Sequence, residues 1–305
     1  MRLRLTPRRS SISELQPAPP DLKSAPIGMF DSGFGGLTVA RAVMDLMPNE
    51  QLIYLGDTAR YPYGPRELGE VAEFAHQIAE ELIVERGVKV LIVACNTAAA
   101  AALDSLSEQY DIPIMGVIEP GVASLLKATD TGHVGVIGTV GTIGSGAYQR
   151  AVSARAANAG ATAPELTALA CPGFVEFVER GVFDTEQVRV LAERLLAPAL
   201  DAKVDTLLLG CTHYPYLART ISDVMGHDVV LVSSADETAF ALREVLAESG
   251  LAASESPADE SGKSTETPPA RFITTGDVNS FEELGRTLLG PELERAEQLI
   301  WPPLP

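Results

Sequence analysis

Short apolar runs alternate with longer amphipathic stretches through most of the chain. Runs bounded by Gly, Asp, Asn or Pro predict strands over 27–31, 51–55, 88–94, 114–118, 133–139, 165–172, 204–211, 227–234 and 270–277. Between them, apolar residues recur at spacings of three and four, as in "ELGEVAEFAHQIAEELIVERG", which predicts amphipathic helices. This alternation favours parallel sheets with helices on their faces, so the predicted fold class is α/β.

The chain also repeats its own pattern. "IGMFDSGFGGLTVARAV" and "VGVIGTVGTIGSGAYQR" each predict a strand, a turn rich in glycine and hydroxyl groups, and a helix, with turns at Asp31 and Thr139. "VLIVACNTAAAAAL" and "TLLLGCTHYPYL" both end an apolar strand in a cysteine, Cys95 or Cys211. The turns are 108 positions apart and the cysteines 116, so we expect two similar α/β domains that face each other.

The expected domain boundaries follow from these repeats. Residues 26–118 and 226–290 are expected to form the first domain, and residues 119–225 the second. Residues 1–25 are predicted to be a disordered tail. The stretch 252–269 has almost no large apolar residue, which predicts a flexible insert in the first domain. Residues 291–305 are expected to be a C-terminal tail, since the prolines of "LIWPPLP" lack the amide donors that a helix needs.

Composition limits the class of protein and its partners. The chain has 305 residues and a formal net charge of -18, whereas nucleic acids and anionic membranes bind basic surfaces. No stretch approaches the ~18–20 apolar residues that span a bilayer. Three cysteines, an odd number, do not predict a disulfide framework and fit a reducing compartment. We therefore expect a cytoplasmic protein with no membrane partner and no direct nucleic-acid partner.

The unusual motifs all lie in turns that follow predicted strands, where parallel α/β sheets bind their ligands. These turns are Asp31-Ser32-Gly33, Asp57-Thr58, Pro62-Tyr63-Gly64, Cys95-Asn96-Thr97, Thr139–Thr142 and Cys211-Thr212-His213. "DSGFGG" lacks both the G-x-G-x-x-G spacing and a P-loop lysine. It is either an ordinary turn before a helix or a site where Asp31 and Ser32 bind an ammonium group.

Cys95 and Cys211 each stand between a strand and a helix, where amide donors and the helix dipole lower the pKa of a thiol. Cys171, in "LACPGF", fits the role of a small buried apolar residue. A zinc site with His213 lacks the usual ligand spacing. A cysteine hydrolase with His213 as base leaves one thiol unexplained.

Two further interpretations use both thiols. A redox pair requires Cα atoms under ~7 Å apart, closer than two walls of a substrate cleft allow. Alternatively, one thiolate removes a proton from one face of a carbon while the other thiol returns a proton to the opposite face. This second reaction inverts a stereocentre.

Five motifs, in order, resemble those of glutamate racemases in the cofactor-independent aspartate/glutamate racemase superfamily: "GMFDSGFGGLTV", "YLGDTARYPYGPR", "VACNTAAA", "GVIGTVGTIGSGAY" and "LGCTHYP". The resemblance runs from about residue 27 to 250 and resumes at "FITTGD". It implies two flavodoxin-like domains with mostly parallel sheets and an active site in the cleft between them. It also implies interconversion of L- and D-glutamate without pyridoxal phosphate, another cofactor or a metal. The D-isomer supplies peptidoglycan synthesis.

The resemblance assigns roles to individual residues. Cys95 is expected to act on D-glutamate and Cys211 on L-glutamate, with Asp31 and Ser32 holding the substrate ammonium. His213 and Glu179 are expected on the Cys211 side. Contacts with the substrate are expected from Tyr63, Gly64, Asn96, Thr97, Thr139, Thr142, Thr212 and His213. Asp31 beside Cys95 raises the pKa of that thiol until a bound ammonium neutralises the carboxylate.

Some alternatives stay open at this point. Aspartate racemase and hydantoin racemase are sister activities, because the two thiols define the reaction better than the substrate. A non-catalytic binding protein, for instance one that docks on DNA gyrase, is the alternative from another class. A homodimer is also expected.

Overall fold

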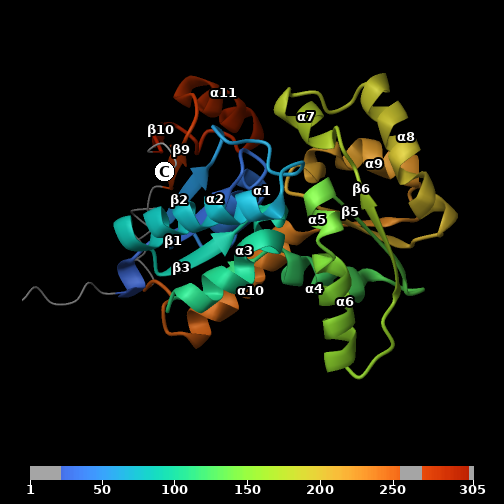
Figure 1. The fold of residues 1–305 in the computed structure, drawn as a ribbon, viewed down its shortest axis with the longest axis horizontal. Helices are drawn as coiled ribbons and strands as arrows, with labels where there is room; N and C mark the ends of the chain where they lie inside the picture. Colours follow the sequence, from blue (N-terminus) through green and yellow to red (C-terminus); the bar gives the residue numbers. More distant parts are fainter. Residues whose placement is uncertain (1–21, 255–269, 302–305) are drawn as a thin grey trace, which may run out of the picture.

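The computed structural model describes residues 22–254 and 270–301. These residues form two β-sheets, and every strand pair in both is parallel (Figure 1). The first sheet contains, in spatial order, β10 (Ala296–Gln298), β9 (Arg271–Thr274), β2 (Leu52–Gly56), β1 (Ile27–Asp31), β3 (Val90–Val93) and β4 (Ile114–Gly116). The second contains β6 (Glu165–Ala170), β5 (His133–Gly138), β7 (Thr206–Gly210) and β8 (Val230–Ser233).

The two sheets share one strand order. The order β2-β1-β3-β4 in the first sheet is matched by β6-β5-β7-β8 in the second. Strand β1 therefore corresponds to β5, and β3 to β7, as the sequence repeats predict. The first sheet differs by the addition of β9 and β10 beyond β2. The predicted α/β class with two parallel sheets is confirmed.

The helices cover both faces of each sheet. They are α1 (Leu37–Leu46), α2 (Leu68–Glu80), α3 (Asn96–Gln109), α4 (Ile118–Ala128), α5 (Val140–Gly144), α6 (Ala147–Asn158), α7 (Phe174–Glu179), α8 (Glu186–Asp201), α9 (Ala218–Met225), α10 (Ser234–Glu248) and α11 (Val278–Leu288). Three shorter turns are η1 (Leu22–Ser24), η2 (Glu81–Glu85, a π-helical turn that extends α2) and η3 (Tyr214–Leu217).

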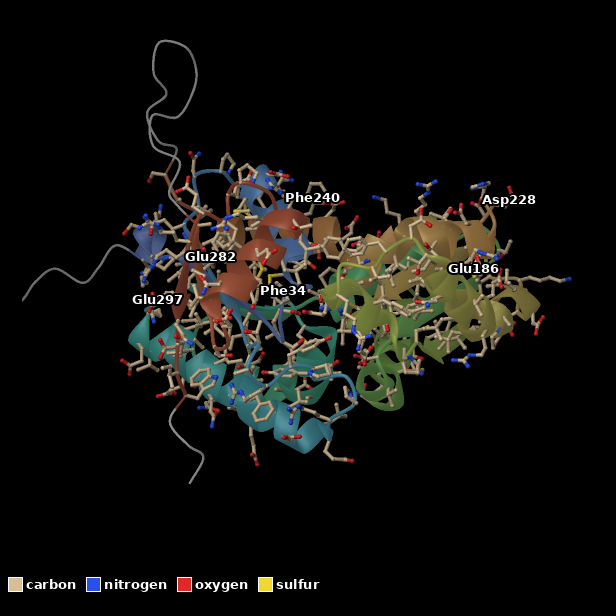
Figure 2. The ribbon with its side chains drawn as sticks, turned by 90° about the horizontal axis from the view of Figure 1, so that it is seen from above. Phe34, Glu186, Asp228, Phe240, Glu282 and Glu297 are labelled. Carbon is tan, nitrogen blue, oxygen red and sulfur yellow. The ribbon has the colours of Figure 1, made fainter. Side chains whose placement is uncertain are left out.

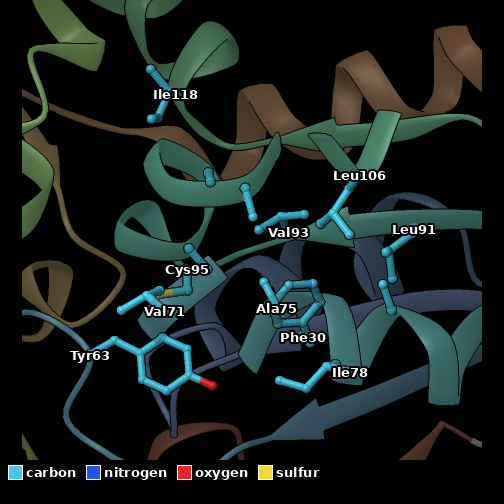
Figure 3. Close-up of a cluster of buried hydrophobic side chains, with 14 of the residues drawn as sticks. Phe30, Tyr63, Val71, Ala75, Ile78, Leu91, Val93, Cys95, Leu106 and Ile118 are labelled. Atoms are coloured by element: carbon cyan, nitrogen blue, oxygen red, sulfur yellow. The ribbon is translucent and has the colours of Figure 1, made fainter. Parts of the chain in front are cut away.

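Side-chain alternation along the strands divides the core. Phe30 and Val93 pack with helices α2 and α3 on one face of the first sheet (Figure 3), whereas Met29 and Ile92 pack with α1, α10 and α11 on the other. In the second sheet, α4 and α6 cover one face and α7, α8 and α9 cover the other. The cluster under α2 and α3 continues into the second sheet, so the two sheets share an apolar core.

Three expected boundaries differ from the structure. Strand β8 pairs with β7, so the return to the first sheet comes through α10 and lies beyond the predicted boundary at 225. The predicted tail after 290 contains β10, which pairs with β9. The predicted N-terminal tail extends to 25, but residues 22–24 form η1, where the buried Lys89 Nζ donates to the Lys23 carbonyl (2.8 Å). Most of that tail and most of the predicted insert, 1–21 and 255–269, lie outside the described residues.

Charged side chains cover the outside of the molecule. Glu186 and Asp228 extend from the end that carries the second sheet, and Glu297 extends from the first (Figure 2). Across residues 22–254 and 270–301, no helix combines the length and apolar character needed to cross a bilayer.

Candidate active site

The two repeated cysteines lie at equivalent places in the two sheets. Cys95 follows β3 and is the N-cap residue of α3, and Cys211 follows β7 and precedes η3. Both side chains are buried, with 5% of each residue exposed, and both are free thiols. The backbone position of each thiol is therefore set by the repeated strand order.

The turn after β1 connects the surroundings of the two thiols. Asp31 is fully buried; its Oδ1 accepts from the Gly33 amide (2.9 Å) and its Oδ2 accepts from Thr212 Oγ1 (3.2 Å). Ser32 Oγ lies 3.8 Å from Cys95 Sγ. Because Thr212 follows Cys211 directly, the turn at Asp31 contacts both the Cys95 thiol and the neighbour of Cys211. The predicted pairing of Asp31 and Ser32 with Cys95 is present in the structure.

The Cys95 thiol is held in its neutral form. Burial, followed by the nearby charge of Asp31, raises the pKa of Cys95 to about 12. The Ala98 amide at the start of α3 and Ser32 act in the opposite direction but do not outweigh these effects. The sequence expectation that the helix N-terminus lowers the pKa of this thiol is wrong for Cys95, because desolvation dominates. A charge on Cys211 also raises the pKa of Cys95, which indicates that the two thiols interact electrostatically.

Cys211 belongs to a line of three polar groups. Its Sγ lies 3.8 Å from His213 Nδ1, and His213 Nε2 lies 2.6 Å from Glu179 Oε1 at the end of α7. Burial alone lowers the pKa of His213, but its contacts with Cys211 and Glu179 raise the pKa well above the usual value. A protonated His213 therefore places a positive charge between the Cys211 sulfur and the Glu179 carboxylate.

Close packing of glycines places this line against the turn after β1. A Cβ atom at Gly35 would lie 2.4 Å from His213 Nδ1, and one at Gly33 would lie 3.1 Å from Glu179 Oε1. Only glycine at position 35 lets the imidazole approach the backbone this closely. The glycines of "DSGFGG" can be read from the sequence, but the sequence does not show that His213 and Glu179 pack against them.

Three threonines join the two sheets on the other side of Cys95. Thr97 Oγ1 lies 2.9 Å from Thr139 Oγ1 and 3.1 Å from Thr142 Oγ1, and the last two lie 2.9 Å apart. Asn96 is buried and accepts from the Tyr148 hydroxyl (2.6 Å). Its amide nitrogen has no hydrogen-bond partner among the residues that the structure describes. Hydroxyl and amide donors of this kind bind carboxylates.

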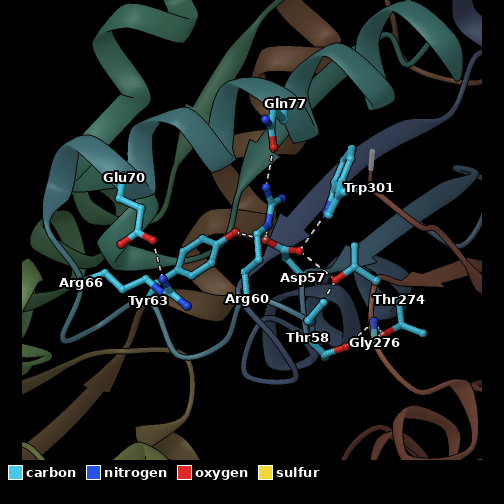
Figure 4. A network of polar contacts seen from close by, with 12 residues as sticks. Asp57, Thr58, Arg60, Tyr63, Arg66, Glu70, Gln77, Thr274, Gly276 and Trp301 are labelled. Carbon is cyan, nitrogen blue, oxygen red and sulfur yellow. Dashed lines mark hydrogen bonds and ion pairs between the residues drawn. The ribbon is translucent and has the colours of Figure 1, made fainter. Parts of the chain in front are cut away.

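The turn at 62–64 lies where it was predicted, but its tyrosine points elsewhere. The Tyr63 hydroxyl donates to Asp57, inside the first domain's core (Figures 3 and 4). Gly64 instead faces the second sheet: its carbonyl accepts from the Gly141 amide (2.9 Å), and a Cβ there would lie 2.8 Å from the Thr139 Cβ. The contact between the sheets is therefore made by Gly64 rather than by the Tyr63 side chain.

Two tyrosines near the thiols, Tyr61 and Tyr148, were not among the site residues predicted from the sequence. The Tyr61 ring centroid lies 6.4 Å from that of His213, and within residues 22–254 and 270–301 the buried Tyr61 hydroxyl has no hydrogen-bond partner. Tyr148 orients Asn96 through the hydrogen bond already described. "ARYPYG" offers two tyrosines with no signal that the first faces the thiols. Tyr148 belongs to "GSGAY", where no spacing links it to Asn96.

Cys171 is buried apart from these contacts, and burial raises the pKa of this thiol to about 12. Within the ranges 22–254 and 270–301, no three His, Cys, Asp or Glu side chains are grouped so as to hold a metal ion.

Two buried thiols lie at the same strand end of repeated α/β units, and the turn at Asp31 contacts the surroundings of both, an arrangement that fits the racemase class whose motifs the sequence resembles. The family model for Asp/Glu/Hydantoin racemase matches residues 38–242, and the chain belongs to this family. It is therefore an isomerase, and the resemblance seen in the sequence is confirmed.

Relatives and solved structures agree with this assignment. A protein named glutamate racemase from Parafrankia is 49% identical over 89% of this chain and 93% of its own length. The crystal structure of a glutamate racemase isoform from Bacillus anthracis superposes with a TM-score of 0.82 at 40% identity, over 91% of this chain and 98% of that one. The glutamate racemase from Francisella tularensis in complex with D-glutamate has a TM-score of 0.79 at 34% identity, with coverage of 91% and 98%.

Proposed function

We propose that the protein interconverts L- and D-glutamate by proton transfer through Cys95 and Cys211. The observation that carries the proposal is the pair of buried thiols at equivalent strand ends, with Asp31 in contact with both surroundings. The names of the relatives support glutamate as the substrate.

Each turnover uses one thiolate and one thiol. From L-glutamate, the Cys211 thiolate takes the α-proton and the Cys95 thiol donates its own proton to the opposite face of the carbon. The reverse reaction starts with a Cys95 thiolate and a Cys211 thiol. One proton leaves the carbon and one is added, so charge and atoms balance in either direction and the two cysteines end in exchanged protonation states.

The remaining groups bind and orient the substrate. Asp31 and Ser32 hold the ammonium, whose positive charge offsets the carboxylate that raises the pKa of Cys95. Hydroxyl and amide donors of Asn96, Thr97, Thr139, Thr142 and Thr212, together with the turn at Gly64, hold the two carboxylates. His213, supported by Glu179, stabilises the negative charge on Cys211.

Racemisation of L- and D-glutamate, followed by circular dichroism, tests the proposal, with L- and D-aspartate as competing substrates. Loss of optical rotation with glutamate supports it. Activity with aspartate alone would reassign the substrate, and no activity with either would contradict the proposal.

We further propose that the D-isomer supplies peptidoglycan synthesis in the cytoplasm. Depletion of the protein in its host should then cause cell-wall defects that added D-glutamate reverses. The homodimer and a contact with DNA gyrase stay predictions, which sedimentation of the protein alone and with gyrase would test.

A further inference from the structure

A second buried carboxylate lies at the end of β2, apart from the thiols. Asp57 is fully buried and accepts from four side chains (Figure 4). Arg60 Nε (2.7 Å) and the Tyr63 hydroxyl donate to Oδ2, and Thr275 Oγ1 (2.8 Å) and Trp301 Nε1 (3.1 Å) donate to Oδ1. A buried carboxylate requires such donors, because each replaces water lost on burial.

One of these donors comes from the far end of the chain. Residues 296–301, here called the C-terminal clasp, are held on the first sheet by strand pairing, a backbone hydrogen bond and an ion pair. Strand β10 pairs with β9, the Leu299 amide donates to the Thr274 carbonyl (2.9 Å), and Arg86 binds both oxygens of Glu297 (2.7 and 3.0 Å). These contacts bring Trp301 to Asp57.

The Trp301 ring also contacts the guanidinium of Arg60. The Arg60 Cζ lies 4.7 Å from the Trp301 ring and 4.2 Å from the Phe74 ring, within the range of cation–π contacts. Trp301 therefore contacts the Asp57 cluster, which consists of Asp57 and its four donors, in two ways. Its Nε1 donates a hydrogen bond to the Asp57 carboxylate, and its ring packs on the Arg60 guanidinium that pairs with that carboxylate.

The Asp57 cluster contacts the turn at 62–64, which packs against the second sheet. The Tyr63 hydroxyl is fixed on Asp57, and the next residue, Gly64, accepts from the Gly141 amide and packs on Thr139. Thr139 in turn contacts Thr97, two residues after Cys95. A continuous set of contacts thus runs from the C-terminal clasp to the proposed carboxylate-binding threonines.

We infer that Trp301 is a positioning residue for substrate binding. Through Asp57 and Tyr63, the clasp sets the place of Gly64 against Thr139, and so the geometry of the donors that receive a substrate carboxylate. This role rests on the proposed function, because it assumes that Thr97 and Thr139 bind substrate. Trp301 touches neither thiol, so it acts on binding more than on proton transfer.

The chain contains a single tryptophan, which makes this role observable by spectroscopy. Indole emission is sensitive to a nearby cation and to hydrogen bonding at Nε1. Titration of the wild-type protein with D-glutamate should therefore change Trp301 emission, since substrate at Thr139 acts on the same set of contacts. In Tyr63→Phe, which keeps Trp301 but lacks the hydroxyl that joins Asp57 to the turn, this change should shrink by at least about half.

Kinetics of Trp301→Phe provide the second readout. Phenylalanine keeps a ring beside Arg60 but cannot donate to Asp57, so KM for glutamate should rise about 5-fold while kcat stays within about 2-fold. Ile300→Ala is the matched control, since this neighbouring side chain is exposed and should leave both constants unchanged. Restoring a ring donor with Trp301→His should recover part of the lost affinity.

The outcomes separate the two proposals. Wild-type racemisation measured first decides the proposed function, and D-glutamate titration of emission measures the clasp without requiring turnover. Three results would overturn the positioning role while leaving racemisation intact. They are an unchanged KM in Trp301→Phe, a fall in its kcat with no change in KM, and a Trp301 emission that D-glutamate does not alter. A Trp301→Phe protein that does not fold would leave the Tyr63→Phe emission measurement to decide.

Discussion

Cys95 and Cys211 occupy the same place in two repeated units, yet their neighbours carry opposite charge. Cys95 lies beside the turn of a buried carboxylate, Asp31, and its pKa is raised to about 12. Cys211 lies 3.8 Å from His213, whose pKa is raised well above its usual value. The repeated backbone fixes where each sulfur lies, and the neighbouring side chains give the two sulfurs different electrostatic surroundings.

This difference has a consequence for the free protein. Because its pKa is raised, Cys95 is a thiol in the free protein, and this is the state that the proposed reaction of L-glutamate requires of Cys95. D-glutamate requires the reverse state, which its ammonium helps to reach by neutralising Asp31. The asymmetry therefore belongs to the side chains and not to the fold.

Replacing the sulfur of either cysteine should have the largest effect on racemisation. Cys95→Ser and Cys211→Ser should each lower kcat/KM for glutamate by at least ~10³-fold, because a hydroxyl is a far weaker acid and base than a thiol near neutral pH. The two enantiomers have equal free energy in water, so both directions must lose the same factor. Circular dichroism from each enantiomer measures this.

Cys171→Ala is the matched control for those variants. This cysteine is also buried and packs in the same apolar cluster as Cys211, but it has no part in the proposed proton transfer, so its loss should leave kcat/KM within about 2-fold. Near-normal turnover in either serine variant would contradict the two-base assignment.

Neutralising Asp31 should make the surroundings of the two thiols more alike. Asp31→Asn removes a charge that raises the pKa of Cys95, so thiolate should form there at lower pH. The same change removes the partner of the substrate ammonium and should raise KM about 100-fold. Alkylation of Cys95 by iodoacetamide, followed across pH by peptide mass spectrometry, measures the first effect.

The exposed carboxylate of α1, Asp45, provides the control, and Asp45→Asn should leave the alkylation profile unchanged. If thiolate formation at Cys95 in Asp31→Asn shifted to higher pH, the electrostatic role of Asp31 would be wrong.

Glu179→Gln should lower the pKa of His213 beside Cys211 without changing the surroundings of Cys95. Its effect on kcat/KM should be smaller than that of either cysteine substitution. Glu179 helps to raise the pKa of His213, so its loss lowers that pKa, and His213 becomes neutral as pH rises through the neutral range. Between about pH 6 and 8, kcat/KM of the variant should fall about 10-fold relative to wild type. Glu176→Gln, an exposed change on the same helix, should keep the wild-type profile, and a matching fall there would remove Glu179 from the account.

Much of this arrangement could be predicted from the sequence, because the relevant signals are local. Each cysteine follows an apolar run directly, and parallel strands bring their carboxyl ends to one edge, so the motifs were expected in turns at that edge. The closeness of Asp31 to Cys95 was expected from the resemblance to glutamate racemases. The threonines at 139 and 142 were expected for the same reason. The repeats also predicted two similar α/β halves, and the two sheets do share a strand order.

The features that the sequence did not predict depend on contacts between residues far apart in the chain. The sequence does not say which sheet receives β8, because both offer a parallel edge. Strand β10 is three residues long, with no alternation to predict it. Tyr63 was expected to face substrate, but its hydroxyl contacts Asp57, a buried carboxylate that requires donors. Burial also outweighs the lowering of the Cys95 pKa that the helix N-terminus was expected to cause, and it acts in the same direction as the raising expected from Asp31.

Deuterium incorporation tests the opposed thiols most directly. The protein is mixed with L-glutamate in D2O, and the α-position of both enantiomers is analysed by mass spectrometry after separation, at low conversion. The two-thiol account predicts deuterium at the α-carbon of newly formed D-glutamate and little in the remaining L-glutamate, because the second thiol delivers a solvent-derived proton to the opposite face. Equal label in both enantiomers from the earliest times, or D-glutamate that keeps the original proton, would contradict it.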